Sequence, residues 1–180
     1  MTETGHIPSI EEIANRMAIE DVLHKHSRGV DRADAVVLKN AYWPEAEVAY
    51  GGFNGLAHTF CEALPVSIKR YEATAHRVTN ISIDFYEDNA VVESYVTAYH
   101  YQANEDTNDT ELTYIGRYID HMQKRHNVWK IMFRRVVMEW NQNLTTSAVF
   151  EGPTFSGLAR GGRAPDDPLY EMQKQFNGEP

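Results

Sequence analysis

Four residues of this chain have side chains that could carry out acid–base chemistry: Asp31, Tyr50, His76 and His100. A carboxylate beside an imidazole fixes the tautomer of the histidine, so that the free ring nitrogen can accept a proton. A second imidazole and a phenol across the same cavity could stabilise an oxyanion or protonate a departing oxygen. We therefore interpret these four as candidate catalytic residues, with Asp31 and His76 as a dyad.

Each of these residues also has a purely structural interpretation. Asp31 lies where a predicted helix breaks, so it could be a turn residue or the cap of the next helix. His76 could be a core histidine with satisfied hydrogen bonds, and Tyr50 an ordinary strand aromatic. Taken singly, each residue fits the structural interpretation better, and only the combination points to a site.

The two histidines have a suggestive spacing. His76 lies near the start of one predicted strand and His100 near the end of the next, and Asp88 in the turn between them is equally far from both. If the strands pair through that turn, the histidines lie nearly opposite each other on one face.

The N-terminal part of the chain predicts three helices. Ser9 followed by Glu12 is a capping-box signal for the first. Apolar residues then recur at every third or fourth position, and Gly29 is expected to end or bend this helix. The second and third helices are predicted over residues 32–42 and 53–70.

Strands dominate the remainder of the chain, with apolar and polar residues in alternation and polar turns between the runs. The predicted strands cover residues 45–50, 74–86, 90–102, 112–122 and 128–140. Helices followed by long antiparallel strands indicate the α+β class rather than alternating βαβ units. Strands of this length must coil and bend, so we predict a cone-shaped α+β barrel whose strongly curved sheet wraps the helices around an interior.

The domain organisation follows from a change in composition near residue 140. Residues 1–140 are predicted to form the cone, whereas residues 141–180 are rich in glycine and proline yet contain many apolar side chains. We interpret this segment as an arm or lid that docks on its own domain or on a neighbouring subunit, and the alternative is a disordered tail.

Length, charge and absent motifs restrict the classes of function. A chain of 180 residues forms one domain, and its net charge of −9 argues against a nucleic-acid partner and against anionic membranes. The single cysteine, Cys61, excludes an internal disulfide and a multi-cysteine metal site. The glycine-rich, nucleophile-elbow and zinc-peptidase motifs are missing, and we predict no metal and no cofactor.

The start of the chain bears on location. Residues 1–8 lack a basic-then-apolar signal pattern, and no apolar run approaches the roughly 20 residues of a membrane-spanning helix. We therefore expect a cytoplasmic protein.

Several short sequence motifs, in the order in which they occur along the chain, resemble those of the SnoaL-like branch of the nuclear-transport-factor-2-like superfamily. They are Ile19-Glu20-Asp21-Val22-Leu23, Gly29-Val30-Asp31-Arg32-Ala33-Asp34, Thr74-Ala75-His76 with Asn80, Gly116-Arg117-Tyr118-Ile119-Asp120, and Trp129-Lys130-Ile131 with Arg134-Arg135. The branch includes scytalone dehydratase, bile-acid dehydratase and lindane dehydrochlorinase. By this resemblance, Asp31 and His76 match the catalytic dyad of the family, and Tyr50 and His100 match a tyrosine and a second histidine that scytalone dehydratase uses on its substrate.

The chain also departs from scytalone dehydratase. That enzyme has a tyrosine directly before the dyad aspartate, where this chain has Val30, and its later serine and asparagine are not recognisable over residues 115–118. The resemblance implies a cofactor-independent lyase or isomerase, dehydratase-like, that acts on a small hydrophobic cyclic or polycyclic compound of steroid or polyketide type. The alternative is a non-catalytic ligand-binding module or one like the small subunit of an oxygenase.

Aromatic residues on the long strands predict assembly. Tyr95, Tyr99, Tyr114 and Tyr118 are expected to leave one side of the sheet in need of cover. Relatives in the superfamily pair such faces, so we expect a homo-oligomer, with a trimer favoured.

Overall fold

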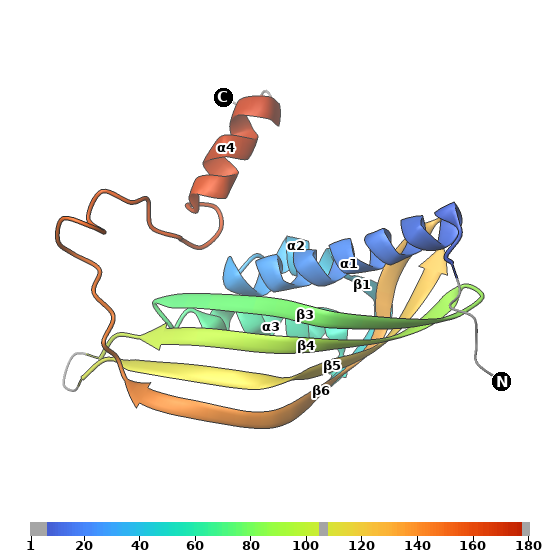
Figure 1. The fold of residues 1–180 in the computed structure, drawn as a ribbon, viewed down its shortest axis with the longest axis horizontal. Helices are drawn as coiled ribbons and strands as arrows, with labels where there is room; N and C mark the ends of the chain where they lie inside the picture. The colour runs from blue at the N-terminus through green and yellow to red at the C-terminus, as the bar shows by residue number, and fades with distance from the viewer. Residues whose placement is uncertain (1–6, 105–107, 178–180) are drawn as a thin grey trace.

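The computed structural model of the chain describes residues 7–104 and 108–177. Three helices come first along the chain, interleaved with a short hairpin, and four long strands follow (Figure 1). The elements are α1 (Ile10–Asp31), α2 (Ala35–Asn40), β1 (Tyr42–Tyr50), β2 (Phe53–Leu56), α3 (Ala57–Ile68), β3 (Ala73–Tyr86), β4 (Asn89–Gln102), β5 (Thr110–Arg125), β6 (Val128–Thr145) and α4 (Pro168–Asn177).

The six strands form one curved sheet in the order β2-β1-β6-β5-β4-β3. All neighbours are antiparallel except β1 and β6, which run parallel. Helices α1, α2 and α3 lie on one side of this sheet, and the core lies between the two layers (Figure 1). The predicted α+β class and curved, mostly antiparallel sheet are confirmed, although the sheet remains open, with β2 and β3 as its edges.

The segment between the first helix and the long strands differs most from the prediction. The helix predicted over 32–42 is reduced to α2, whose N-cap Asp34 accepts hydrogen bonds from the backbone of Val36 and Val37. The predicted strand 45–50 begins earlier, at Tyr42, whose side chain is buried. The helix predicted from Phe53 instead begins at Ala57, because residues 53–56 pair with β1 across a tight turn.

Helix α1 runs through Gly29 to Asp31, so this glycine does not end the helix, which was one of the two predictions made for it. The residue is needed for close packing. A Cβ atom at position 29 would lie 2.8 Å from the backbone nitrogen of Leu38 in α2. The glycine therefore lets α2 approach α1 two residues before the candidate dyad aspartate.

We expect Gly29→Ala to destabilise the protein by about 1–3 kcal/mol, the usual cost of overpacking a well-packed core. The neighbouring atoms are the backbone nitrogen, the Cα and the Cβ of Leu38, which cannot move aside as the end of a flexible side chain can. Gly52→Ala is the matched control, since a Cβ there meets nothing within 4 Å. Urea unfolding of both variants measures the difference, and equal stabilities would contradict this account of Gly29.

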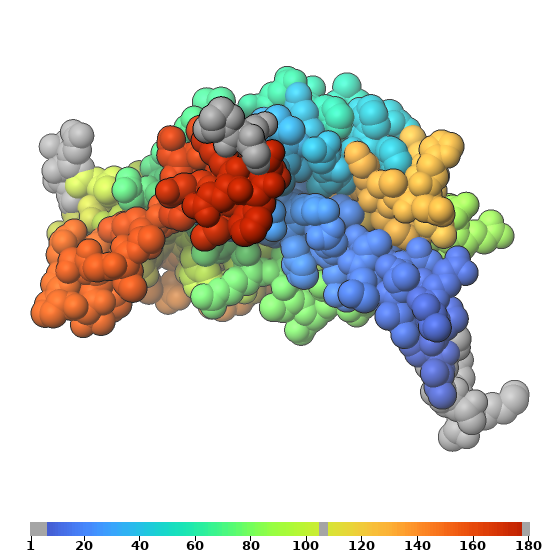
Figure 2. Space-filling model, turned by 90° about the horizontal axis from the view of Figure 1, so that it is seen from above, coloured from blue at the N-terminus to red at the C-terminus, as the bar shows by residue number. Residues whose placement is uncertain are grey.

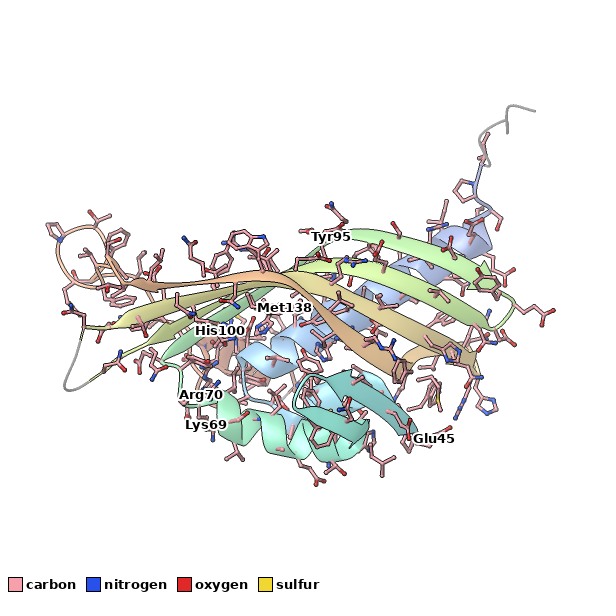
Figure 3. All side chains as sticks on the ribbon, turned by 90° about the horizontal axis from the view of Figure 1, so that it is seen from below. Glu45, Lys69, Arg70, Tyr95, His100 and Met138 are labelled. Atoms are coloured by element: carbon pink, nitrogen blue, oxygen red, sulfur yellow. The ribbon has the colours of Figure 1, made fainter. Side chains whose placement is uncertain are left out.

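The two faces of the sheet differ in character. In β4, Ser94 and Ala98 are buried towards the helices, whereas Tyr95 and Tyr99 are exposed on the other face. Figure 3 shows Tyr95 and His100 on opposite sides of the sheet. The prediction that two tyrosines of β5 share the exposed face is wrong, because Tyr118 pairs with Ser94 and Tyr114 with Ala98. Both therefore face the interior.

The chain after the sheet forms a distinct segment, residues 146–177, which we call the C-terminal arm. Strand β6 extends to Thr145, beyond residue 140, where the sequence analysis ends the cone domain. The arm then crosses to the carboxyl end of α1 and finishes in α4 (Figures 1 and 2).

The arm is hydrogen-bonded to the domain from which it extends. The backbone N–H of Ala164 donates to the carbonyl of Arg32 at 2.7 Å. The hydroxyl of Tyr170 donates to Oδ2 of Asp34, also at 2.7 Å. These contacts place the arm beside the end of α1, where the candidate dyad begins.

Candidate active site

Asp31 and His76 are held together by two hydrogen bonds. Asp31 is the last residue of α1, and His76 lies on β3. Nδ1 of His76 is 2.7 Å from Oδ1 of Asp31, and the backbone N–H of His76 donates to Oδ2 at 2.9 Å. The side chain of His76 is only 7% exposed and that of Asp31 only 14%. Because a carboxylate can only accept, the neutral imidazole of His76 has its proton on Nδ1 and a lone pair on Nε2.

The two histidines lie on one face and nearly opposite each other, as the sequence spacing predicts, but they are offset by two residues along the ladder. His76 pairs with Ala98, and His100 pairs with Thr74. The hairpin turn is tighter than assumed, since Tyr86 pairs with Asn89.

A β-bulge in β3 nevertheless brings both histidines to one face. The register shifts between Thr79 and Ser82, where Asn80 has a φ of 47°. An unbroken ladder from the turn would pair His76 with Tyr99 and direct His76 to the outer face, because side chains alternate along a strand. With the bulge, the imidazole centroids are 5.5 Å apart in an edge-on arrangement.

His100 is a neutral hydrogen-bond acceptor at neutral pH. Its Nδ1 lies 3.3 Å from the carbonyl oxygen of Leu112, so this nitrogen carries the proton. Burial, together with the nearby His76, lowers the pKa of His100 to about 4. The free Nε2 suits acceptance of a hydrogen bond or proton from a substrate hydroxyl. Donation to an oxyanion, one of the roles considered from the sequence, does not fit this protonation state.

Tyr50 contributes through a pair of phenols. Its hydroxyl lies 3.2 Å from the hydroxyl of Tyr118, and burial raises the pKa of both groups. One proton joins the two oxygens, so the other proton of the pair is available to a ligand. Tyr114 is committed elsewhere, because its hydroxyl donates to the carbonyl of Val137 at 2.8 Å.

A buried ion pair packs against the ring of Tyr118, one of these two phenols. Arg134 makes two hydrogen bonds to the carboxylate of Asp120, at 2.7 and 2.6 Å, and both side chains are fully buried. The guanidinium carbon of Arg134 lies 4.0 Å from the centre of the Tyr118 ring. This stacked cation fixes the plane of the ring and hence the direction of its hydroxyl.

A cavity of about 440 Å³ connects these groups. Apolar side chains from α1, α3, β4, β5 and β6 form most of its wall, and Tyr71 packs against the His100 ring with centroids 4.6 Å apart. The residues on the wall that carry polar side-chain groups are Tyr50, Arg70, Tyr71, His76, His100, Tyr114 and Tyr118. This combination of an apolar wall and a few polar groups is typical of a site for a small organic molecule.

The SnoaL-like domain family matches residues 11–135. The chain belongs to this family. The match covers every strand up to the first half of β6 and includes all four sequence-predicted site residues. The resemblance seen in the sequence is therefore confirmed at the level of the family.

Solved structures share the fold of this SnoaL-like protein. A hexachlorocyclohexane dehydrochlorinase from Novosphingobium barchaimii has a TM-score of 0.66 at 20% identity, covering 80% of this chain and 99% of its own. A candidate scytalone dehydratase from Novosphingobium aromaticivorans has 0.62 at 24%, covering 82% and 97%. A protein from Kribbella flavida has 0.66 at 14%, covering 72% and 94%. No curated protein sequence matches the chain.

Sequence reasoning missed two parts of the SnoaL-like site, Tyr118 and Arg134. Both residues occur in the sequence motifs that carry the family resemblance, but Tyr118 was predicted to lie on the wrong face of its strand. The available signal was the pairing of β5 with the alternating buried positions of β4. Arg134 gave no such signal, because arginine is rarely buried unless it has a partner.

Within residues 7–104 and 108–177, no cluster of three or more histidine, cysteine, aspartate or glutamate side chains could hold a metal ion. In the same part of the chain, no helix is long and apolar enough to cross a membrane.

The buried histidines make stability depend on pH. His100 has its pKa lowered from 6.5 to about 4, and burial also lowers the pKa of His26. Between about pH 6.5 and pH 4, the unfolded chain binds protons that the folded chain does not, so stability falls as the pH falls. Above this range the two states bind these protons equally and the effect disappears.

We therefore expect the melting temperature to fall as the pH is lowered from about 7.5 to about 5. His100→Gln, which removes one titrating group, should show a smaller fall over the same range. Arg70 and Asp31 also lie near enough to His100 to influence its charge. The wild-type protein and the His100→Gln variant must therefore be compared at one salt concentration. An identical pH dependence in the variant would show that His100 is not the group responsible.

Proposed function

We propose that this SnoaL-like protein is a cofactor-independent lyase or isomerase that removes a proton from a small cyclic or polycyclic compound. The observation that carries the proposal is the buried Asp31–His76 pair on an apolar cavity. Asp31 holds the proton of His76 on Nδ1, which leaves Nε2 as the base. No hydrogen bond from another described residue occupies that nitrogen.

The proposed reaction begins at a carbon next to a carbonyl or leaving group. Nε2 of His76 takes the proton, and the C–H electron pair forms a double bond. In an elimination, the leaving group departs with the electrons of its own bond. In an isomerisation, the electrons move onto the carbonyl oxygen, and the proton returns at another carbon. Asp31 stabilises the imidazolium formed in either case.

The remaining polar groups can interact with the oxygen atoms of the substrate, whereas His76 acts on its C–H bond. The available proton of the Tyr50–Tyr118 pair can hydrogen-bond the carbonyl or departing oxygen. His100 can accept a hydrogen bond from a substrate hydroxyl. The apolar wall excludes water and strengthens these contacts. Similar folds in a dehydrochlorinase and a candidate dehydratase are consistent with eliminations of this kind.

The cavity favours a compact, mainly apolar substrate. Its volume of about 440 Å³ lies within the usual range for small-molecule sites and matches one or a few fused rings. The two histidines and the Tyr50–Tyr118 pair on the cavity wall favour a ring that carries both an oxygen function and an acidic C–H. A cyclic β-hydroxy ketone has both.

Proton exchange with solvent tests this proposal without knowledge of the leaving group. Cyclic ketones and β-hydroxy ketones would be incubated with the protein in D₂O, and deuterium uptake and enone formation followed by mass spectrometry and absorbance. We expect uptake that requires both His76 and Asp31. His24→Ala is the matched control, because His24 lies on the exposed side of α1.

If a ring compound binds but exchange with the wild-type protein equals that of the His76→Ala variant, the protein is not a proton-transfer enzyme. The alternative of a non-catalytic binding module would then replace this proposal.

A further inference from the structure

Arg163 of the C-terminal arm reaches the candidate dyad from outside the cavity. Its Nη1 donates to the carbonyl oxygen of Asp31 and, at 2.9 Å, to Oγ1 of Thr74. Its Nη2 donates to the carbonyl oxygen of Tyr71 at 2.8 Å. One guanidinium thus joins the end of α1, the segment before β3, and β3 itself.

All three acceptors are next to the site. Asp31 is the dyad carboxylate, and Thr74 lies two residues before His76 on the same face of β3. Tyr71 packs against the ring of His100. A shift of any one of these segments would change the distance between the Asp31 carboxylate and the His76 imidazole.

The arm also completes the carboxyl end of α1. The last carbonyl groups of a helix have no partner within the helix, and a cation there is favoured by the helix dipole. Here the carbonyl of Asp31 accepts from Arg163, and that of Arg32 accepts from the backbone of Ala164 at 2.7 Å. The cap of the helix that carries the dyad aspartate is therefore supplied by a segment more than a hundred residues away.

We infer that Arg163 is a positioning residue that fixes the Asp31 carboxylate against Nδ1 of His76, and that the C-terminal arm is thereby part of the active site. This inference rests on the proposed function, in which Asp31 and His76 act as a dyad. Arginine suits the position because its planar guanidinium presents several donors in a fixed geometry. Lysine has one nitrogen and cannot reach both carbonyl groups in the same way.

The tautomer of His76 provides a readout that needs no substrate. In ¹⁵N-histidine-labelled protein, NMR shifts report whether the proton is on Nδ1 or Nε2, and His76→Ala assigns the signal. We expect the wild-type His76 to be protonated on Nδ1 and Arg163→Ala to show a mixture of both tautomers. A merely structural arginine would not change this ratio well below the melting temperature.

Turnover in the exchange assay should fall in parallel. Small misplacements of a catalytic group can cost about 10²-fold, so we expect kcat to fall by about 10- to 100-fold in Arg163→Ala and less in Arg163→Lys. Arg160→Ala is the matched control. It removes the same charge from the same arm, where Arg160 stacks on Phe150, and should leave both readouts unchanged.

In the Asp31→Asn background, Arg163→Ala should add little further loss, because both changes act through one carboxylate. A wild-type tautomer in both Arg163→Ala and Arg163→Lys would overturn the inference, whatever happens to turnover. If the wild-type protein exchanges no probe, the proposed function fails, and the tautomer measurement alone decides the role of Arg163.

Discussion

Replacing His76 with alanine should lower proton exchange into a cyclic ketone by about 10²–10⁴-fold, the usual contribution of a general base. The variant keeps the cavity but loses the only imidazole that is hydrogen-bonded to a carboxylate in the described part of the chain. Initial rates of deuterium uptake, measured at saturating ketone, give the effect on kcat.

Asp31→Asn should cause a comparable loss. The amide keeps the shape of the carboxylate but can donate an N–H towards His76, which favours the tautomer with its proton on the wrong nitrogen. The double variant should be little worse than either single variant, because the two residues act as a unit. Losses that multiply in the double variant would mean that the residues act separately.

Stability must be measured on the same samples. Asp31 also accepts the backbone N–H of His76, so its replacement removes a structural hydrogen bond, commonly worth about 0.5–1.5 kcal/mol, more when the acceptor is charged. A small loss of stability with a large loss of exchange would support catalysis. Activity lost only in proportion to the unfolded fraction would return both residues to a structural role.

Asp120→Ala should have the largest effect on stability, about 3–5 kcal/mol. The change leaves the guanidinium of Arg134 fully buried without its carboxylate. Arginine cannot give up its proton to escape this cost. Urea unfolding measures the loss, and a loss below about 1 kcal/mol would show that water reaches the guanidinium.

Two further variants make that measurement specific. Glu93→Ala breaks the partly exposed ion pair between Glu93 and Arg117, and surface pairs contribute about 0–1 kcal/mol. The double variant Asp120→Leu with Arg134→Met should recover most of the lost stability, because apolar groups of similar volume can replace a buried ion pair. It should nevertheless impair the site, since the Tyr118 ring loses its stacked cation.

Local patterns in the sequence were sufficient for the outline of the fold. Side-chain alternation depends on neighbouring residues, which is why all four long strands were predicted, three of them to within three residues at both ends; β6 continues five residues beyond its predicted end. The β2 hairpin was missed because its four residues are too few to show a period. The role of Gly29 was mispredicted because the group that requires a glycine there, the backbone of Leu38, lies on another helix.

The amino-acid sequence alone determined the α+β class, the curved sheet, the family, and the identity of Asp31, Tyr50, His76 and His100 as the residues to examine. The tertiary structure decided which atoms of these residues meet. The bulge beside Asn80 directs His76 inwards, and Arg134 orients Tyr118. Arg163 reaches the dyad from 132 positions away along the chain. Such contacts join segments that are distant in sequence. The hydrophobic periodicity within one segment therefore cannot predict them.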